Sequence, residues 1–270
     1  MINRWTVEAW ERDRFRHPLL GEHVPEADIE RLWDDSAAHY DCARYESIVS
    51  NVIAKLDSEG LLSGTVLDIG CGPGTFAIPF SRRANQIIAL DSSRPMLERL
   101  KTTCSSEGIT NINPVEADCK SIPEDIRCDL AFSSLCPPMN NPQSILSMEK
   151  HGKVCAYLSS ANAGTSIETE IWSELGEDYS YIGYHTEYPR HFLQSQRRKP
   201  ELIFYSQEYS IDEDETAVTS KHLASMARFR PITDEIRNAV MSVVSRHSEN
   251  GRVRINGKTI MGLLIWQSEY

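Results

Sequence analysis

The sequence predicts an α/β fold in which helices flank a mostly parallel sheet. Three observations support this prediction: short apolar segments that run into an acidic residue, a glycine-rich turn directly after the first of them, and helical periodicity between them. The apolar segments recur at about the length of one strand and one helix, as parallel strands require for their crossovers. The carboxyl ends of such strands meet at one edge of the sheet, where α/β proteins bind ligands.

The first 60 residues are expected to form helices that precede the sheet. Apolar residues recur at helical spacing around Trp5, Ala9 and Trp10, and again over residues 45–56. The first strand is predicted at residues 65–69, and it carries Asp68 near its end.

Glycines at positions 70, 72 and 74 follow this strand. They let the backbone turn tightly and approach a ligand, because no Cβ stands in the way. The carboxylate of Asp68 is expected to face the same turn. A carboxylate there suits a ligand with an amino group and positive charge, such as S-adenosylmethionine, better than a pyrophosphate, which is bound by amide N–H groups at a helix N-terminus.

Two alternatives compete with this interpretation. A dinucleotide site has the pattern G-x-G-x-x-G after a strand, and Thr75 stands here at the third glycine, which weakens the dinucleotide case. The other alternative is a turn that binds nothing. The following segments favour a ligand site, because they bring further acids to the same edge of the sheet.

The next strands are predicted at residues 86–91, 112–117, 128–135 and 153–158. Asp91 ends the first of these and can accept hydrogen bonds from two ribose hydroxyls, whereas Asp118 follows the second and can accept from an adenine amino group. A helix opens after Asp91 with Ser92, and its Met96 is either a core residue or a contact for the adenine ring.

The rest of the chain is expected to add a strand at 201–209, helices at 216–229 and 233–247, and a last strand at 258–266. These two strands would close the sheet as an antiparallel hairpin. Residues 136–139 (CPPM) are interpreted as a rigid loop, because two prolines end the strand. The basic run at 197–199 is expected to be solvated surface.

Four segments resemble the ordered motifs of class I S-adenosylmethionine-dependent methyltransferases: VLDIGCGPGTF (66–76), IIALDSS (87–93), VEADCKSIP (115–123) and CDLAFSSL (128–135). Residues 32–41 (LWDDSAAHYD) resemble the helix that precedes the core in the small-molecule branch, often called type 11. The resemblance covers roughly residues 30–160. It implies a seven-stranded Rossmann-like methyltransferase sheet with N-terminal helices and a helical cap inserted after strand 5.

The resemblance also implies S-adenosylmethionine as the cofactor. Asp68 and the glycine loop would hold its methionine end together with Tyr40, Asp91 the ribose, Asp118 the adenine, and Ser133 and Ser134 would form the floor beside the sulfonium. The residues assigned to the cofactor are Tyr40, Asp68, Gly70, Gly72, Gly74, Asp91, Ser92, Met96, Asp118, Cys119, Ser133 and Ser134.

The chain is expected to divide into an N-terminal helical segment (1–60), a cofactor-binding core (61–160), a cap that binds the acceptor (161–200) and a C-terminal part that completes the sheet (201–270). The cap contains a cluster of tyrosines and histidines at 179–191. Its His185, His191 and Tyr184 are candidates for the general base, and Tyr181 for a wall of the acceptor pocket. The alternative is that these side chains pack or are solvated.

Composition bears on partners and location. The 28 Lys and Arg against 39 Asp and Glu give a formal charge of −11, which argues against a nucleic-acid partner. Charged residues crowd the start of the chain, so we expect neither a signal peptide nor a membrane span, and hence a cytoplasmic protein. The seven cysteines include no C-x-x-C pair, so neither a disulfide framework nor a metal site is expected.

The sequence therefore predicts methyl transfer from S-adenosylmethionine to a small-molecule acceptor by a monomer or homodimer. Two alternatives remain: methylation of a protein or protein-bound cofactor, and a non-catalytic module that binds the cofactor. The residues do not identify whether the methylated atom is O, N, S or C.

Overall fold

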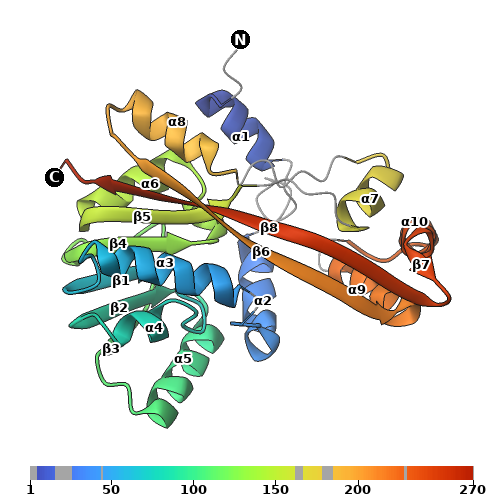
Figure 1. Cartoon of the computed structure of the whole chain (residues 1–270), viewed down its shortest axis with the longest axis horizontal. Coiled ribbons are helices and arrows are strands. Elements are labelled where there is room, and N and C mark those ends of the chain that lie inside the picture. The colour runs from blue at the N-terminus through green and yellow to red at the C-terminus, as the bar shows by residue number, and fades with distance from the viewer. Residues whose placement is uncertain are drawn as a thin grey trace.

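The computed structural model describes residues 5–15, 26–43, 45–161, 167–177, 185–227 and 230–269, which build one central sheet with flanking helices (Figure 1). The strands are β1 (Thr65–Ile69), β2 (Gln86–Asp91), β3 (Ile112–Glu116), β4 (Cys128–Ser134), β5 (Gly152–Ser160), β6 (Glu201–Asp214), β7 (Ser248–Glu249) and β8 (Arg252–Gln267). Their order is β3-β2-β1-β4-β5-β8-β6, and β7 pairs with β8 off this path. This arrangement confirms the predicted α/β fold with a seven-stranded main sheet.

The pairing directions fix where a ligand can bind. Strands β1 to β5 are parallel to one another, whereas β8 runs antiparallel to both β5 and β6. The strand order reverses at β1, which lies between β2 and β4. In open α/β sheets the crevice at such a point, outside the carboxyl ends of the strands, is the usual ligand site.

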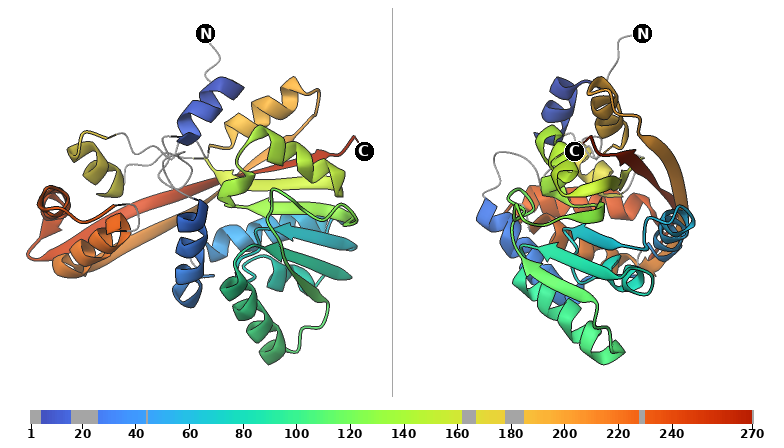
Figure 2. Two further views of the ribbon diagram at one scale, coloured as in Figure 1. Left: turned by 180° about the vertical axis from the view of Figure 1, so that it is seen from behind. Right: turned by 90° about the vertical axis from the view of Figure 1, so that its left-hand side faces the viewer.

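Helices cover both faces of the sheet, as the two turned views show (Figure 2). The helices that contribute to the core on one face are α3 (Glu46–Ser58), α4 (Ala77–Ser81) and α5 (Arg94–Glu107). Those on the other face are α1 (Val7–Phe15), α6 (Pro142–Ser147) and α8 (Glu187–Ser195). The apolar stripe predicted for residues 45–56 becomes the buried face of α3. Helix α5 begins at a capping hydroxyl, Ser93, and ends at Gly108 in the left-handed region.

Short connections complete the region that surrounds the strand ends. Helix α2 (Glu26–Ser36) continues directly into the turn η1 (Ala37–His39), which delivers the chain to Tyr40. The turn η2 (Pro137–Met139) follows β4 and contains the two prolines of the predicted rigid loop. The turn η3 (Met148–Lys150) precedes β5.

Strands β6 and β8 continue past the main sheet as a two-stranded ribbon (Figure 1). Around its far end lie α7 (Ile167–Glu174), α9 (Glu215–Ala227) and α10 (Asp234–Arg246), which share a separate apolar core with the ribbon. We call these helices and the far end of the ribbon the distal lobe. Its fully buried side chains include Ile171, Val240, Val243 and Val253.

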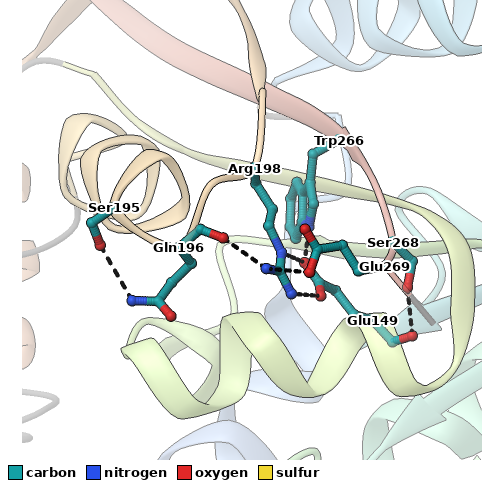
Figure 3. A network of polar contacts seen from close by, with 7 residues as sticks. All are labelled: Glu149, Ser195, Gln196, Arg198, Trp266, Ser268 and Glu269. Carbon is teal, nitrogen blue, oxygen red and sulfur yellow. Dashed lines mark hydrogen bonds and ion pairs between the residues drawn. The ribbon is translucent and has the colours of Figure 1, made fainter.

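A buried ion pair lies where β6 begins and β8 ends, and it joins this region to the turn η3 before β5 (Figure 3). Arg198 Nε and Nη2 donate to the two carboxylate oxygens of Glu149 at 2.9 and 2.6 Å, and Trp266 Nε1 donates to Glu149 Oε1 at 2.9 Å. The Glu149 side chain is 0% exposed and that of Arg198 is 14% exposed. The expectation that the run 197–199 is solvated surface is therefore wrong for Arg198, because a buried carboxylate distant in sequence holds it.

All seven cysteines are free in the structure. Cys119 and Cys136, which follow β3 and β4, bring their sulfur atoms within 4.0 Å of each other in the core. Within the described part of the chain, no helix has both the length and the apolar character needed to cross a membrane.

Candidate cofactor and acceptor site

A cavity lies at the carboxyl ends of β1 and β4, the position that the strand order indicates. Five of the residues predicted for the cofactor line it: Tyr40, Asp68, Gly70, Gly72 and Ser134. Its remaining wall is largely apolar and comes from several elements, including Ile48, Val49, Phe76, Leu158 and Met261. The sequence did not predict these apolar residues as site residues, because apolar side chains on a buried strand or helix look the same whether they face a core or a cavity.

Asp68 is the acidic group of this cavity. It is 1% exposed, and its Oδ2 atom is buried without a hydrogen-bond partner. Burial, and then the neighbouring charge of Asp91, raise the pKa of Asp68 to about 7, although the backbone N–H of Ala77 acts in the opposite direction. A buried carboxylate oxygen that no donor satisfies costs free energy. A cationic donor in the cavity, such as an ammonium group, would remove that cost.

The three glycines of the turn differ in what they avoid. All have positive φ, but a Cβ on Gly70 would lie 2.4 Å from Cys136 Sγ, and one on Gly74 would lie 2.6 Å from Leu100 Cδ1. A Cβ on Gly72 would meet no protein atom within 4 Å. Gly70 and Gly74 are therefore needed for packing, whereas Gly72 keeps open the space along the cavity wall.

Asp91 is tied to this turn. Its Oδ2 accepts from the Gly72 N–H at 2.7 Å and its Oδ1 accepts from the Ser93 N–H at 2.9 Å. Burial raises the pKa of Asp91, and these backbone donors lower it in part. Asp91 thus stands at the end of β2, as predicted, in direct contact with the glycine loop.

The other residues predicted for the cofactor lie outside the cavity wall. Met96 is buried at the start of α5, and Ser133 donates to the Ile69 carbonyl at 3.0 Å. Asp118 is exposed and accepts from the Lys120 N–H, while Cys119 is buried against Cys136. The carboxylate of Asp118 thus stabilises the turn after β3. Ser92 lies next to Asp91 in the turn that opens α5.

Two features of the wall were not recognised from the sequence. The hydroxyl oxygen of Thr75 is buried without a partner in the same cavity as Asp68. A hydroxyl can donate, whereas the Asp68 carboxylate accepts, so the cavity offers groups of opposite hydrogen-bond character. Leu135 adopts φ 45°, a left-handed conformation that is strained for a branched side chain.

The histidines predicted for catalysis lie on α8 and just before it. His185 precedes Thr186, whose N–H donates to the Ser160 carbonyl at the carboxyl end of β5. The His185 ring stacks on Trp5 with centroids 4.7 Å apart, and His191 Nδ1 lies 2.9 Å from the Glu187 carbonyl. Neither histidine is among the described residues that line the Asp68 cavity. Tyr181 and Tyr184 lie outside the described residues.

A buried polar cluster neighbours these histidines. Tyr188 on α8 donates its hydroxyl to Asp13 on α1, and Trp10 Nε1 donates to Asn140 Oδ1 at 3.2 Å. These bonds fix α1 against α8 and against the loop after β4.

Comparisons with known proteins agree with this geometry. Residues 66–150 match the family model of a methyltransferase domain. The fold resembles that of a candidate methyltransferase from Bacillus halodurans C-125, with a TM-score of 0.55 and 14% identity over 81% of this chain and 99% of that one. Residues 66–150 thus carry a methyltransferase domain, within a fold like that of the class I methyltransferases. Domains of this class depend on S-adenosylmethionine, the cofactor that the sequence predicted.

Other relatives extend the comparison. The magnesium protoporphyrin IX methyltransferase of Synechocystis PCC 6803, with bound S-adenosylhomocysteine, has a TM-score of 0.50 and 13% identity over 94% of this chain and 93% of that one. A Haemophilus influenzae protein described as uncharacterized is 57% identical over 127 residues, which are 44% of this chain and 46% of that protein. A 23S rRNA (uracil(1939)-C(5))-methyltransferase of Francisella tularensis subsp. novicida is 35% identical over 49 residues, 18% of this chain and 11% of the enzyme. The chain therefore spans less than half the length of these curated relatives.

Proposed function

We propose that this chain transfers a methyl group from S-adenosylmethionine to a small-molecule acceptor. The observation that carries the proposal is the buried, unpartnered oxygen of Asp68 in a cavity beside the Gly72 turn. These residues fit the cofactor, because an amino-acid end offers an ammonium group for Asp68 and a carboxylate for the Thr75 hydroxyl. The cofactor supplies a methyl group activated by a positively charged sulfur.

The remaining cofactor contacts are part of the proposal. Asp91 would hold the ribose hydroxyls, and Met96, Asp118 and Cys119 would lie toward the adenine. Tyr40 and Ser134 would border the methionine end and the reacting sulfur. Support comes from the position of Asp91, Asp118, Cys119 and Ser134 at or just after the carboxyl ends of β2, β3 and β4, and from Tyr40 and Ser134 in the wall of the Asp68 cavity.

A small acceptor is favoured over a nucleic acid. The formal charge of −11 opposes binding of a polyanion. The magnesium protoporphyrin IX methyltransferase matches the fold over nearly the whole chain, whereas the rRNA methyltransferase shares only a short segment. A basic protein surface remains the second candidate acceptor, because an acidic chain would attract it.

His185, His191 and Tyr184 remain our candidates for the general base. His185 is the best placed of the three, because it directly precedes Thr186, which hydrogen-bonds to the carboxyl end of β5. If either histidine is the base, replacing it with alanine should lower turnover by roughly 10²–10⁴ and leave cofactor affinity unchanged. If both variants keep the turnover of the natural chain, these rings serve only to pack on Trp5.

The deciding experiment combines binding and transfer. Calorimetric titration with S-adenosylhomocysteine should show binding to the natural chain and a loss of tenfold or more in Asp68→Asn, since hydrogen bonds to charged groups contribute roughly 1.5–3 kcal/mol. A cell lysate separated into small molecules, protein and RNA is then incubated with the chain and with S-adenosylmethionine labelled in its methyl group. Label in the small-molecule fraction supports the proposal. Label in protein or RNA contradicts the proposed acceptor, and binding without transfer to any fraction favours a non-catalytic module.

A further inference from the structure

Helix α5 holds the N-terminal segment that carries Tyr40. Arg99 Nη1 donates to the Ala37 carbonyl at 2.9 Å and to the Tyr40 carbonyl at 2.7 Å. The last carbonyls of a helix have no partner within it, and they carry partial negative charge. The half-buried guanidinium of Arg99 therefore donates hydrogen bonds to backbone carbonyls after α2 and after η1, at the point where the chain turns toward the cavity.

A second contact joins the same two segments. Ser93 Oγ donates to Asp34 Oδ1 on α2 at 2.6 Å, and the Ser93 N–H donates to Asp91 Oδ1. Ser93 is also the N-cap of α5 and is almost fully buried. The α2 segment is thus fixed to α5 at Asp34 and again at η1, and its next residue, Tyr40, lines the Asp68 cavity.

These contacts matter for binding because Tyr40 sits in a non-helical conformation, with φ −63° and ψ 123°, directly after a three-residue turn. Without Arg99, the turn would lose both hydrogen bonds from the guanidinium to the Ala37 and Tyr40 carbonyls, so the backbone that carries Tyr40 would be held less firmly. Holding it before the ligand arrives removes an ordering cost from binding.

We propose that Arg99 is a positioning residue for the cofactor, which acts by fixing Tyr40 over the cavity without touching the ligand. This inference rests on the proposed function, because it assumes that the cavity binds S-adenosylmethionine. It makes the N-terminal segment a part of the cofactor site, although that segment precedes the sheet in the sequence.

A double-mutant cycle tests the inference with S-adenosylhomocysteine as the calorimetric probe. Arg99→Met and Tyr40→Ala should each weaken binding by roughly tenfold. The first variant loses the charged donor that positions Tyr40, and the second loses the Tyr40 side chain itself. Both changes remove the same interaction. The affinity of the double variant should therefore be at most about twofold lower than that of the single variant with the lower affinity. Arg94→Met, an exposed arginine of the same helix, serves as the control and should bind normally.

Three outcomes separate the alternatives. Multiplicative losses in the double variant, about 100-fold, would show that Arg99 does not act through Tyr40 and would overturn the inference. Unchanged affinity in Arg99→Met would overturn it as well. If Arg99→Met does not fold, Arg99→Lys replaces it in the cycle, since it keeps the charge but loses the planar donor group. Failure of the natural chain to bind the probe would instead contradict the proposed function.

Discussion

At the scale of single residues, the acid of the cavity, Asp68, is partly neutral near pH 7. Burial raises the pKa of Asp68 to about 7, whereas an unfolded chain leaves an aspartate near its ordinary value of about 3.9. The folded chain therefore binds the proton more tightly than the unfolded chain does. The free energy of unfolding therefore falls as pH rises from roughly 4 to 7, because the unfolded chain releases the Asp68 proton first. Above this range the whole loss of stability from ionising the buried Asp68 is present.

Cofactor affinity should follow the ionisation of Asp68. An ammonium group is paired only by the charged carboxylate, so binding of S-adenosylhomocysteine should strengthen by about fivefold as pH rises from 6 to 7. Calorimetry across this range measures the effect. The Asp68→Asn variant should bind weakly with little pH dependence. An equal slope in that variant would assign the titration to another group, such as Asp91, whose pKa is also raised.

The open space at Gly72 gives a second prediction. Gly72→Ala should weaken cofactor binding by tenfold or more, because the added methyl group occupies space along the cavity. Gly60→Ala is the matched control: Gly60 has φ +72°, a Cβ there also meets nothing within 4 Å, and the residue lies in the turn after α3. Both variants should lose roughly 1 kcal/mol of stability from backbone strain. Equal cofactor affinity in the two variants would show that Gly72 does not face the ligand.

The residues of the glycine turn were predictable because strand ends, acids and glycines leave a local signal. Asp68, Gly70 and Gly72 line the cavity, and their contact with a cofactor stays a prediction. Arg99 could not be found in this way: its partners are backbone carbonyls about 60 positions earlier, and a carbonyl has no sequence signature. The roles of His185 and His191 depend on an acceptor that neither sequence nor fold specifies.

At the scale of elements, the pair formed by Glu149 and Arg198 joins three segments that meet at the amino end of β5. Arg198 lies between α8 and β6, Glu149 lies in η3, and Trp266 lies near the end of β8. Removing one partner leaves a buried charge without compensation, which is far more costly than losing an exposed pair.

Arg198→Met should therefore lower the free energy of unfolding by about 3–5 kcal/mol in urea titrations. Lys153→Met, which removes the exposed pair with Asp129, should cost no more than about 1 kcal/mol. Adding Glu149→Gln to Arg198→Met should restore part of the stability, because the amide is neutral and its oxygen can still accept from Trp266. If Arg198→Met lowers the free energy of unfolding no more than Lys153→Met does, the pair of Glu149 and Arg198 contributes little to stability.

Strand prediction succeeded where strands are buried and fell short where they are not. All five parallel strands begin and end within about two residues of the predicted bounds. The two last strands are longer than predicted because charged and polar residues dominate their outer halves, residues 210–214 and 252–257, and the apolar alternation there is limited to a few residues such as Val253 and Ile255. Cross-strand pairs such as Arg252 with Asp212 stabilise that part of the ribbon.

At the scale of the whole molecule, the apolar interior is divided between the main sheet and the distal lobe. Helix α7, which the sequence placed in a cap, packs in the lobe with α9 and α10, whereas α8 packs on the sheet beside α1. Ion pairs reinforce the lobe: Glu174 bonds to Arg246, and Glu177 bonds to Arg230, whose guanidinium lies 4.7 Å from the Trp172 ring centroid.

The lobe should open independently of the cofactor site. Val243→Ala removes buried methyl groups from the core of the lobe, at a cost of about 1.5–3 kcal/mol, so amide exchange in α9 and α10 should accelerate tenfold or more. Exchange in β1 to β5 and affinity for S-adenosylhomocysteine should not change. Val52→Ala, the same substitution in α3 of the main core, should instead affect the sheet. Uniform acceleration in the Val243 variant would show one cooperative unit.

The position of β8 also has a consequence for synthesis. Strand β8 follows β6 in the chain but lies inside the sheet, between β5 and β6, and β6 hydrogen-bonds to the sheet through β8. While residues 215–251 are being added, the nascent chain therefore holds a finished β6 that cannot yet join its sheet. A long unpaired strand is prone to intermolecular pairing. Chaperone protection of the nascent chain is most valuable in that interval, before β8 is made and can pair with β5 and β6.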